Sequence, residues 1–143
     1  MIHGYVLADG THLDVTQPEF MINFAAGGMF STVSEVNAFY TALLQNRLLK
    51  REAVALMKDG GTSEYGLGLY LWDDSCTRGS YYGHGAGTAG YTGISMASAD
   101  GTRQLTLLVA NRPGDIGSEA GAVYEVHHLV DFARTTLDDL CPE

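Results

Sequence analysis

The first part of the chain combines a turn signal with two helical hydrophobic patterns. Apolar residues flank Asp9-Gly10, a favoured hairpin turn, which predicts a hairpin over residues 5–15 that ends before Pro18. Residues 23–30 are rich in small side chains and predict a loop. Thr32 and Glu35 then form a capping box, and apolar residues follow at helical spacing: Val36, Phe39, Tyr40, Leu43 and Leu44. A second short helix is predicted over residues 51–58, before Asp59-Gly60-Gly61.

The pattern changes to alternation in the second half of the chain. Alternating residues predict a strand over 65–72, and a second short strand is predicted over 80–84. Two further strands, 92–99 and 103–110, are joined by the turn dipeptide Asp100-Gly101. Pro113-Gly114 breaks the chain, and a last helix is predicted over 118–140. This order predicts an α+β fold in which helices pack on an antiparallel sheet.

The length fits a single segment over residues 1–143, with a hairpin and helical part (1–61) followed by strands and the terminal helix (62–143). The formal net charge is −9, from 8 Lys and Arg against 17 Asp and Glu. Nucleic acids and anionic membrane surfaces need a basic face, so neither is expected as a partner. No apolar run approaches the ~20 residues of a membrane span, and residues 1–4 lack the features of a signal peptide.

The two cysteines, Cys76 and Cys141, allow two interpretations. They are either two unrelated buried thiols or one disulfide that ties a loop to the end of the last helix. Both lie in polar, loop-like or terminal contexts, which favours the disulfide. A disulfide would favour an extracytoplasmic or secreted location. The adjacent His127 and His128 point in different directions on a helix, so no metal site is expected there. The pairs Asp73-Asp74 and Asp138-Asp139 are expected to be exposed charges.

The glycine-rich segment 82–91 is the strongest functional signal, and two interpretations of it fail. Residues 85–90 match the dinucleotide fingerprint G-x-G-x-x-G, but the residues that follow have strand character where that motif needs a helix. His84-Gly85-Ala86-Gly87 is similar to the oxyanion loop of α/β-hydrolase lipases, but the G-x-S-x-G elbow of that fold is missing from the sequence.

A third interpretation agrees with the flanking segments. Tyr82-Gly83-His84, with the small residues up to Gly90-Tyr91, resembles the active-site strand of penicillin-recognising serine hydrolases of the class C β-lactamase and D-alanyl-D-alanine carboxypeptidase type. The segments 26–32, Tyr65-Gly66-Leu67-Gly68 and 91–94 also resemble that family. The resemblance spans nearly all of this chain but only the C-terminal part of a family member, and it implies the C-terminal half of a β-lactamase/transpeptidase-like fold.

The resemblance also implies roles for residues. His84 would act electrostatically as a donor near the substrate's carboxylate or acyl group, although a half-buried structural histidine is the alternative. Gly87 would place its N–H in the oxyanion hole, where a side chain would crowd the acyl carbon. Gly85, Ala86 and Thr88 would line the cleft. Ala86 stands where the family usually has Gly, which puts full activity in doubt. No cofactor is implied.

The family's nucleophile motif S-x-x-K is absent from this sequence, because Arg47 and Ala55 stand three positions before its two lysines. The Y-x-N or S-x-N motif is absent too. The sequence therefore predicts part of a DD-carboxypeptidase, β-lactamase or esterase that is inactive alone, with a non-catalytic binding or scaffold domain as the alternative. Expected partners are a small molecule or peptidoglycan peptide as substrate, and either a separate N-terminal half or a second copy of the chain.

Overall fold

The structure, a computed structural model, describes residues 2–16, 29–110 and 119–141. It has the predicted α+β architecture, in which four antiparallel strands form one sheet in the order β3-β4-β5-β6 and a separate hairpin pairs β1 with β2. The elements are β1 (Tyr5–Ala8), β2 (Thr11–Asp14), α1 (Val33–Leu44), α2 (Arg51–Lys58), β3 (Tyr70–Asp74), β4 (Gly79–Thr88), β5 (Tyr91–Ser98), β6 (Gln104–Ala110) and α3 (Glu119–Asp138).

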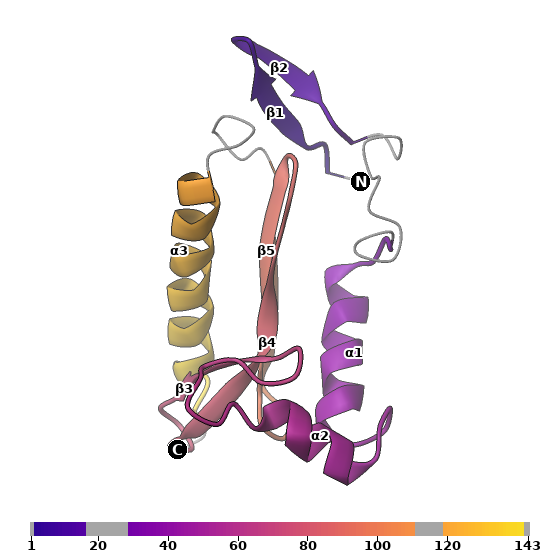
Figure 1. The fold of residues 1–143 in the computed structure, drawn as a ribbon, viewed down its shortest axis with the longest axis vertical. Coiled ribbons are helices and arrows are strands. Elements are labelled where there is room, and N and C mark those ends of the chain that lie inside the picture. Colours follow the sequence, from indigo (N-terminus) through magenta and orange to yellow (C-terminus); the bar gives the residue numbers. More distant parts are fainter. Residues whose placement is uncertain (1, 17–28, 111–118, 142–143) are drawn as a thin grey trace.

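Helices cover both faces of the sheet (Figure 1), with α3 on one face and α1 on the other. Successive side chains of a strand point to opposite faces of the sheet, so the strands contribute to two separate hydrophobic cores. Tyr81, Ile94 and Met96 pack against α3, whereas Ala97 packs with the buried residues of α1 and α2. The strand β5 is buried along nearly its whole length, as expected for a strand with a helix on each side.

Helix α1 begins as the capping box predicts. The Thr32 hydroxyl accepts a hydrogen bond from the Glu35 N–H at 3.2 Å, and the Glu35 carboxylate accepts one from the Thr32 N–H at 2.8 Å. Tyr40, Leu43 and Leu44 are then buried in the core. The α2 bounds match the predicted ones, 51–58. Both helices and the two hairpin turns, Asp9-Gly10 and Asp100-Gly101, are therefore confirmed.

The predicted strand over residues 65–72 is wrong in its first half. Residues 66–69 form a turn, in which the Gly66 N–H donates to the Leu69 carbonyl at 2.8 Å and Gly68 has a φ of 77°. A left-handed glycine breaks the strand conformation that the alternation of side chains suggested. Strand β3 starts only at Tyr70 and continues to Asp74.

The glycine-rich segment corrects a second expectation. The strand predicted over residues 80–84 continues to Thr88, so His84 lies inside β4 rather than at its end. A two-residue turn, Ala89-Gly90, then leads into β5. The other predicted strands and the last helix agree with the structure to within two residues at the described ends. Of the loop expected over 23–30, residues 23–28 lie outside the described residues, as do Pro18 and Pro113-Gly114, and residues 29 and 30 are neither helix nor strand.

A disulfide joins Cys76, after β3, to Cys141, after α3, and confirms the predicted pairing. Beside it, Arg103 of the β5–β6 turn donates to the Asp74 carboxylate at 2.8 Å and to the Tyr81 hydroxyl at 2.6 Å. The Tyr81 hydroxyl in turn donates to the Asp138 carboxylate at 2.8 Å. The disulfide and this polar network together fasten the end of α3 to the sheet.

Asp74 was expected to be an exposed charge, and this expectation is wrong. Asp74 is only 2% exposed and sits in an ion pair with Arg103. Burial raises the pKa of Asp74, but hydrogen bonds from Thr77 and Arg103 and the charge of Arg103 lower it by more, so its net pKa lies below the usual value. Burial and the hydrogen bond to Asp138 raise the pKa of Tyr81. The buried carboxylate is therefore charged and paired, as burial of a charge requires.

The β1–β2 hairpin is docked on the β4–β5 turn, at the opposite end of the sheet from the disulfide (Figure 1). The Tyr91 hydroxyl donates to the Ile2 carbonyl at 2.9 Å. A Cβ on Gly4 would overlap the Tyr91 ring, and a Cβ on Gly90 would lie 2.7 Å from a methyl carbon of Val15. Both glycines therefore permit a contact between segments distant in sequence.

Strand β6 is the last strand of the sheet within the described residues, and its Leu108 and Val109 are 53% and 41% exposed. The expected association with a second copy or an N-terminal half therefore stays a prediction. Among the described residues, no helix is both long and apolar enough to cross a bilayer.

Reducing the Cys76–Cys141 disulfide is expected to lower the free energy of unfolding by about 4 kcal/mol, because the bond closes a long loop in the unfolded chain. Urea unfolding of the oxidised protein, the reduced protein and the Cys76→Ser/Cys141→Ser variant measures this. Thiol titration of the denatured, oxidised protein should find no free thiol. An unchanged unfolding midpoint after complete reduction would contradict the expectation.

Acid is expected to destabilise the fold between about pH 4 and pH 2, because the pKa values of Asp74 and Asp100 are lowered in the folded state. Hydrogen bonds from Ser98 and Thr102 lower the pKa of Asp100 to about 2. The stabilisation is complete above the unfolded-state pKa and is lost as the pH falls through the folded-state pKa. Urea unfolding at a series of pH values should show a shallower decline for Asp100→Asn than for the exposed control Asp73→Asn. An equal decline of stability with falling pH in the two variants would contradict this expectation.

Candidate active site

The candidate site is the outer edge of β4, where the strand extends beyond its neighbour β3. On one side, β5 pairs with β4 from Tyr81 to Thr88. On the other side, β3 pairs only with Gly79–Gly83, because the chain turns away before Tyr70. Residues 84–88 therefore have an outer edge to which the described part of the chain gives no partner strand.

The hairpin geometry determines which backbone groups face this edge. Thr88 and Tyr91 close a two-residue turn, and such a closing pair exchanges both hydrogen bonds. Because hydrogen-bonded and non-hydrogen-bonded pairs alternate along an antiparallel ladder, the N–H and C=O groups of Gly85 and Gly87 point away from β5. The open edge thus offers the N–H groups of Gly85 and Gly87 and the Gly87 carbonyl to an extended ligand, the arrangement by which peptides add to a sheet edge, whereas the Gly85 carbonyl already lies 2.6 Å from Nδ1 of His84.

The described part of the chain leaves space for a side chain at position 87. A Cβ built at Gly87 meets no described atom within 4 Å. Any crowding by a side chain there would thus arise from a bound substrate, and the predicted role of Gly87 at the oxyanion stays a prediction. Ala86 and Thr88 are exposed and share the face of β4 that bears His84, as alternation along a strand requires.

His84 is exposed, and both of its ring nitrogens have partners in the chain. Nδ1 lies 2.6 Å from the carbonyl oxygen of Gly85, and Nε2 lies 3.2 Å from the hydroxyl oxygen of Tyr65. In this arrangement His84 can donate directly to a ligand only if one of these contacts opens. Its expected role as a donor to the substrate stays a prediction.

Aromatic rings surround His84 on the β3 side. The Tyr65 ring meets the imidazole edge-on with centroids 5.7 Å apart, and the Tyr70 ring lies 5.1 Å from it. Tyr70 also stacks on Trp72 at 5.6 Å. Tyr65 and Tyr70 are each 40% exposed, so this aromatic group can contact a ligand that lies along the β4 edge.

Sequence analysis did not assign Tyr65, Tyr70 or Trp72 to the site. The Tyr65-Gly66-Leu67-Gly68 motif was noted, but the predicted strand over this segment hid the turn that brings Tyr65 to His84. Sequence analysis also missed a hydrogen bond at Ser95 of β5, the residue opposite His84 in the sheet. The Ser95 hydroxyl is hydrogen-bonded to the Thr106 hydroxyl of β6. The Thr106 hydroxyl donates to the side-chain oxygen of Asn37 at 2.6 Å, so this hydroxyl chain ties α1 to the sheet.

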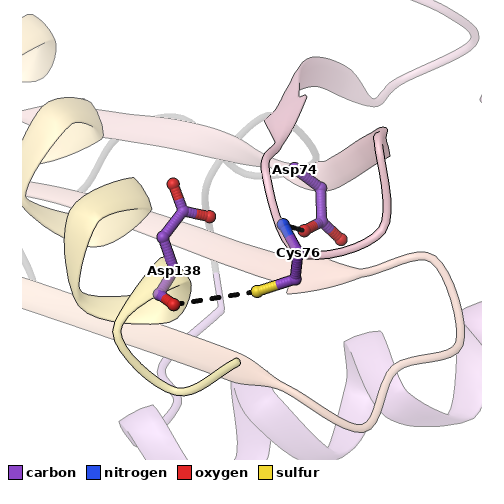
Figure 2. A group of neighbouring side chains, drawn as sticks. All are labelled: Asp74, Cys76 and Asp138. Atoms are coloured by element: carbon purple, nitrogen blue, oxygen red, sulfur yellow. Dashed lines mark hydrogen bonds between the residues drawn. The ribbon is translucent and has the colours of Figure 1, made fainter. Parts of the chain in front are cut away.

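One group of side chains in the described residues has metal-ligand spacing: Asp74, Cys76 and Asp138. The Cys76 Sγ atom lies 3.7 Å from the Asp138 carbonyl oxygen, and the Cys76 N–H donates to the Asp74 carboxylate (Figure 2). The Cys76 sulfur is bonded to Cys141 in the disulfide, and the positively charged Arg103 guanidinium already forms an ion pair with Asp74. The group therefore fits a structural network rather than a metal site.

A surface cavity of about 330 Å³ lies along β3, away from the open edge of β4. It is lined by Ser63, Glu64, Leu71, Trp72, Asp73, Ser80 and Arg134. Its lining mixes both charges with an aromatic ring, and it shares no residue with the edge formed by residues 84–88. It borders the aromatic group beside His84 only through Trp72, which stacks on Tyr70.

The fold is similar to that of two hydrolases of known structure. A D-stereospecific amidohydrolase from a Streptomyces species matches 77% of this chain with a TM-score of 0.65 and 30% identity. The D-amino acid amidase from Ochrobactrum anthropi SV3, complexed with L-phenylalanine amide, matches 94% with a TM-score of 0.61 and 25% identity. The same amidase complexed with D-phenylalanine matches 76% with a TM-score of 0.54 and 28% identity.

These neighbours have the fold of penicillin-recognising serine hydrolases, which confirms the predicted fold. The chain spans 35% to 42% of the length of the matched structures. The neighbours are D-stereospecific amidohydrolases, whereas a likeness to class C β-lactamases or DD-carboxypeptidases in particular is not among these matches. No family model matches the chain.

Proposed function

We propose that this chain forms the substrate-facing wall of a penicillin-recognising serine hydrolase that cleaves amide bonds of D-amino acid derivatives by acyl transfer. The observation that carries the proposal is the open edge of β4 at Gly85 and Gly87, beside His84, in a fold similar to that of two D-stereospecific amidohydrolases. The finer classes expected from the sequence, DD-carboxypeptidase, β-lactamase or esterase, share this acyl-transfer chemistry.

In the proposed reaction, this chain binds the substrate and a separate part of the enzyme provides the nucleophile. A serine hydroxyl oxygen attacks the substrate's carbonyl carbon, the amine leaves with a proton, and water then hydrolyses the acyl-enzyme. In this scheme the outward N–H of Gly87 donates to the carbonyl oxygen as it becomes an oxyanion. The outward N–H of Gly85 and C=O of Gly87 hold the substrate as an added strand. His84, Ala86 and Thr88 lie on the face beside it.

The second candidate is a non-catalytic binding or scaffold domain with the same fold. The open edge supports it as well, since such an edge would bind an extended ligand without any nucleophile. We also propose an extracytoplasmic location, which the disulfide supports because such bonds persist in oxidising compartments.

Alone, the chain is expected not to hydrolyse D-amino acid amides, activated esters or β-lactams, because it lacks the nucleophile motif. Assembled with a segment that supplies S-x-x-K and the Y-x-N type motif, it should give activity on D-phenylalanine amide, measured by ammonia release. The L-amide is the control for stereospecificity. Steady turnover by the pure chain would contradict the expectation, and binding without turnover in the assembled protein would favour the second candidate.

Gly87→Pro is expected to lower kcat in the assembled protein about 10²- to 10³-fold, because it removes an oxyanion donor. The substitution spares the β4–β5 ladder, since the Gly87 N–H faces outward. Gly87→Ala is the matched control: it keeps the N–H and adds the same Cβ, which meets no described atom of the chain, so any crowding of the acyl carbon by the Cβ affects both variants. Thermal unfolding checks that both variants fold. Equal rates for the two variants would remove the Gly87 N–H from the mechanism.

A further inference from the structure

Tyr65 makes a contact with His84 that the proposed chemistry does not use. The hydroxyl oxygen of Tyr65 lies 3.2 Å from Nε2 of the imidazole, and the two rings meet edge-on at an interplanar angle of 76°. Tyr65 is 19 positions before His84 and reaches it from the turn that precedes β3. This contact restrains the second ring nitrogen, in addition to the contact that Nδ1 makes within the strand.

The two partners of the imidazole determine where its proton lies. The Gly85 carbonyl oxygen, 2.6 Å from Nδ1, can only accept, so Nδ1 carries the hydrogen and donates it. A neutral imidazole has one N–H, so Nε2 must then be the acceptor, and the Tyr65 hydroxyl must donate to it. The contacts therefore select one of the two neutral tautomers, an assignment that follows from the partners.

The backbone around Tyr65 is held firmly enough to position its hydroxyl. The Tyr65 N–H donates to the Ser63 hydroxyl at 3.1 Å, and the Leu67 N–H donates to the Met57 carbonyl of α2 at 3.2 Å. A Cβ on Gly66 would collide with the same Met57 carbonyl, so this close approach requires glycine. The turn is thus anchored on a helix, as a positioning group needs.

We propose that the Gly85 carbonyl fixes neutral His84 in its Nδ1–H tautomer and that Tyr65 is the positioning residue that donates to Nε2, so that the open edge presents the Tyr65 oxygen, rather than an imidazole nitrogen, to a ligand. In this state the imidazole has no free donor, and the Tyr65 oxygen keeps a lone pair for a donor group such as an N–H of the substrate. The effect on a bound ligand rests on the proposed function of the β4 edge. The tautomer of His84 can be measured without any activity.

The test is ¹⁵N NMR of the imidazole nitrogens in the full chain at about pH 8.5, where an ordinary imidazole is neutral. His84→Gln identifies the His84 resonances among those of the five histidines. The expected wild-type spectrum shows protonated Nδ1 and unprotonated Nε2. Tyr65→Phe should shift the Nε2 resonance, because this nitrogen loses its hydrogen bond, while Nδ1 stays protonated against the Gly85 carbonyl. Tyr70→Phe is the matched control, since its ring also contacts His84 but its hydroxyl has no hydrogen-bond partner among the described residues.

Two results would overturn the inference: an Nε2–H tautomer in the wild type, or a Tyr65→Phe spectrum identical to that of the wild type. If Tyr65→Phe failed to fold, shown by a lost circular-dichroism spectrum, the wild-type tautomer would still decide the question. In the assembled protein, Tyr65→Phe should lower kcat/KM about three- to tenfold, the effect of one hydrogen bond. An Nδ1–H tautomer in an assembled protein that hydrolyses nothing would refute the proposed function alone.

Discussion

Strand β4 is paired with β5 along one edge up to its turn, but with β3 along the other edge only over its first five residues. This difference determines what the molecule can present to a ligand. β5 supports the strand where β3 is missing, so the outward backbone groups of Gly85 and Gly87 are held in place rather than left flexible. Helices on both faces of the sheet, the disulfide at one end and the β1–β2 hairpin at the other keep this edge in position.

Local signals predicted most of the fold. The capping box of Thr32 and Glu35, the turn pairs Asp9-Gly10 and Asp100-Gly101, and the helical spacing in α1 each act within a few residues, so the sequence displays them directly. The disulfide was also foreseen, from the polar context of Cys76 and Cys141. The fold of the penicillin-recognising hydrolases was reached through a resemblance, not from periodicity.

The missed features depend on contacts between distant segments. The turn at Gly66–Leu69 keeps an alternating side-chain pattern, and only the left-handed φ of Gly68 and the bond to Met57 break the strand. Asp74 looked exposed because its partner, Arg103, comes 29 positions later. For the same reason the contact between Tyr65 and His84 was not predicted. The pattern of residues within one segment does not show which side chain of a turn will contact a residue on another strand.

The alternation of backbone groups along β4 has a consequence for exchange with solvent. The amide hydrogens of Ala86 and Thr88 are locked in the ladder with β5, whereas those of Gly85 and Gly87 face water in the free protein. Neighbouring amides of one strand thus differ in access to deuterium although they share the same stability against unfolding. A ligand that pairs with the edge would abolish this difference, so the isotope content of two glycines reports whether the edge is occupied.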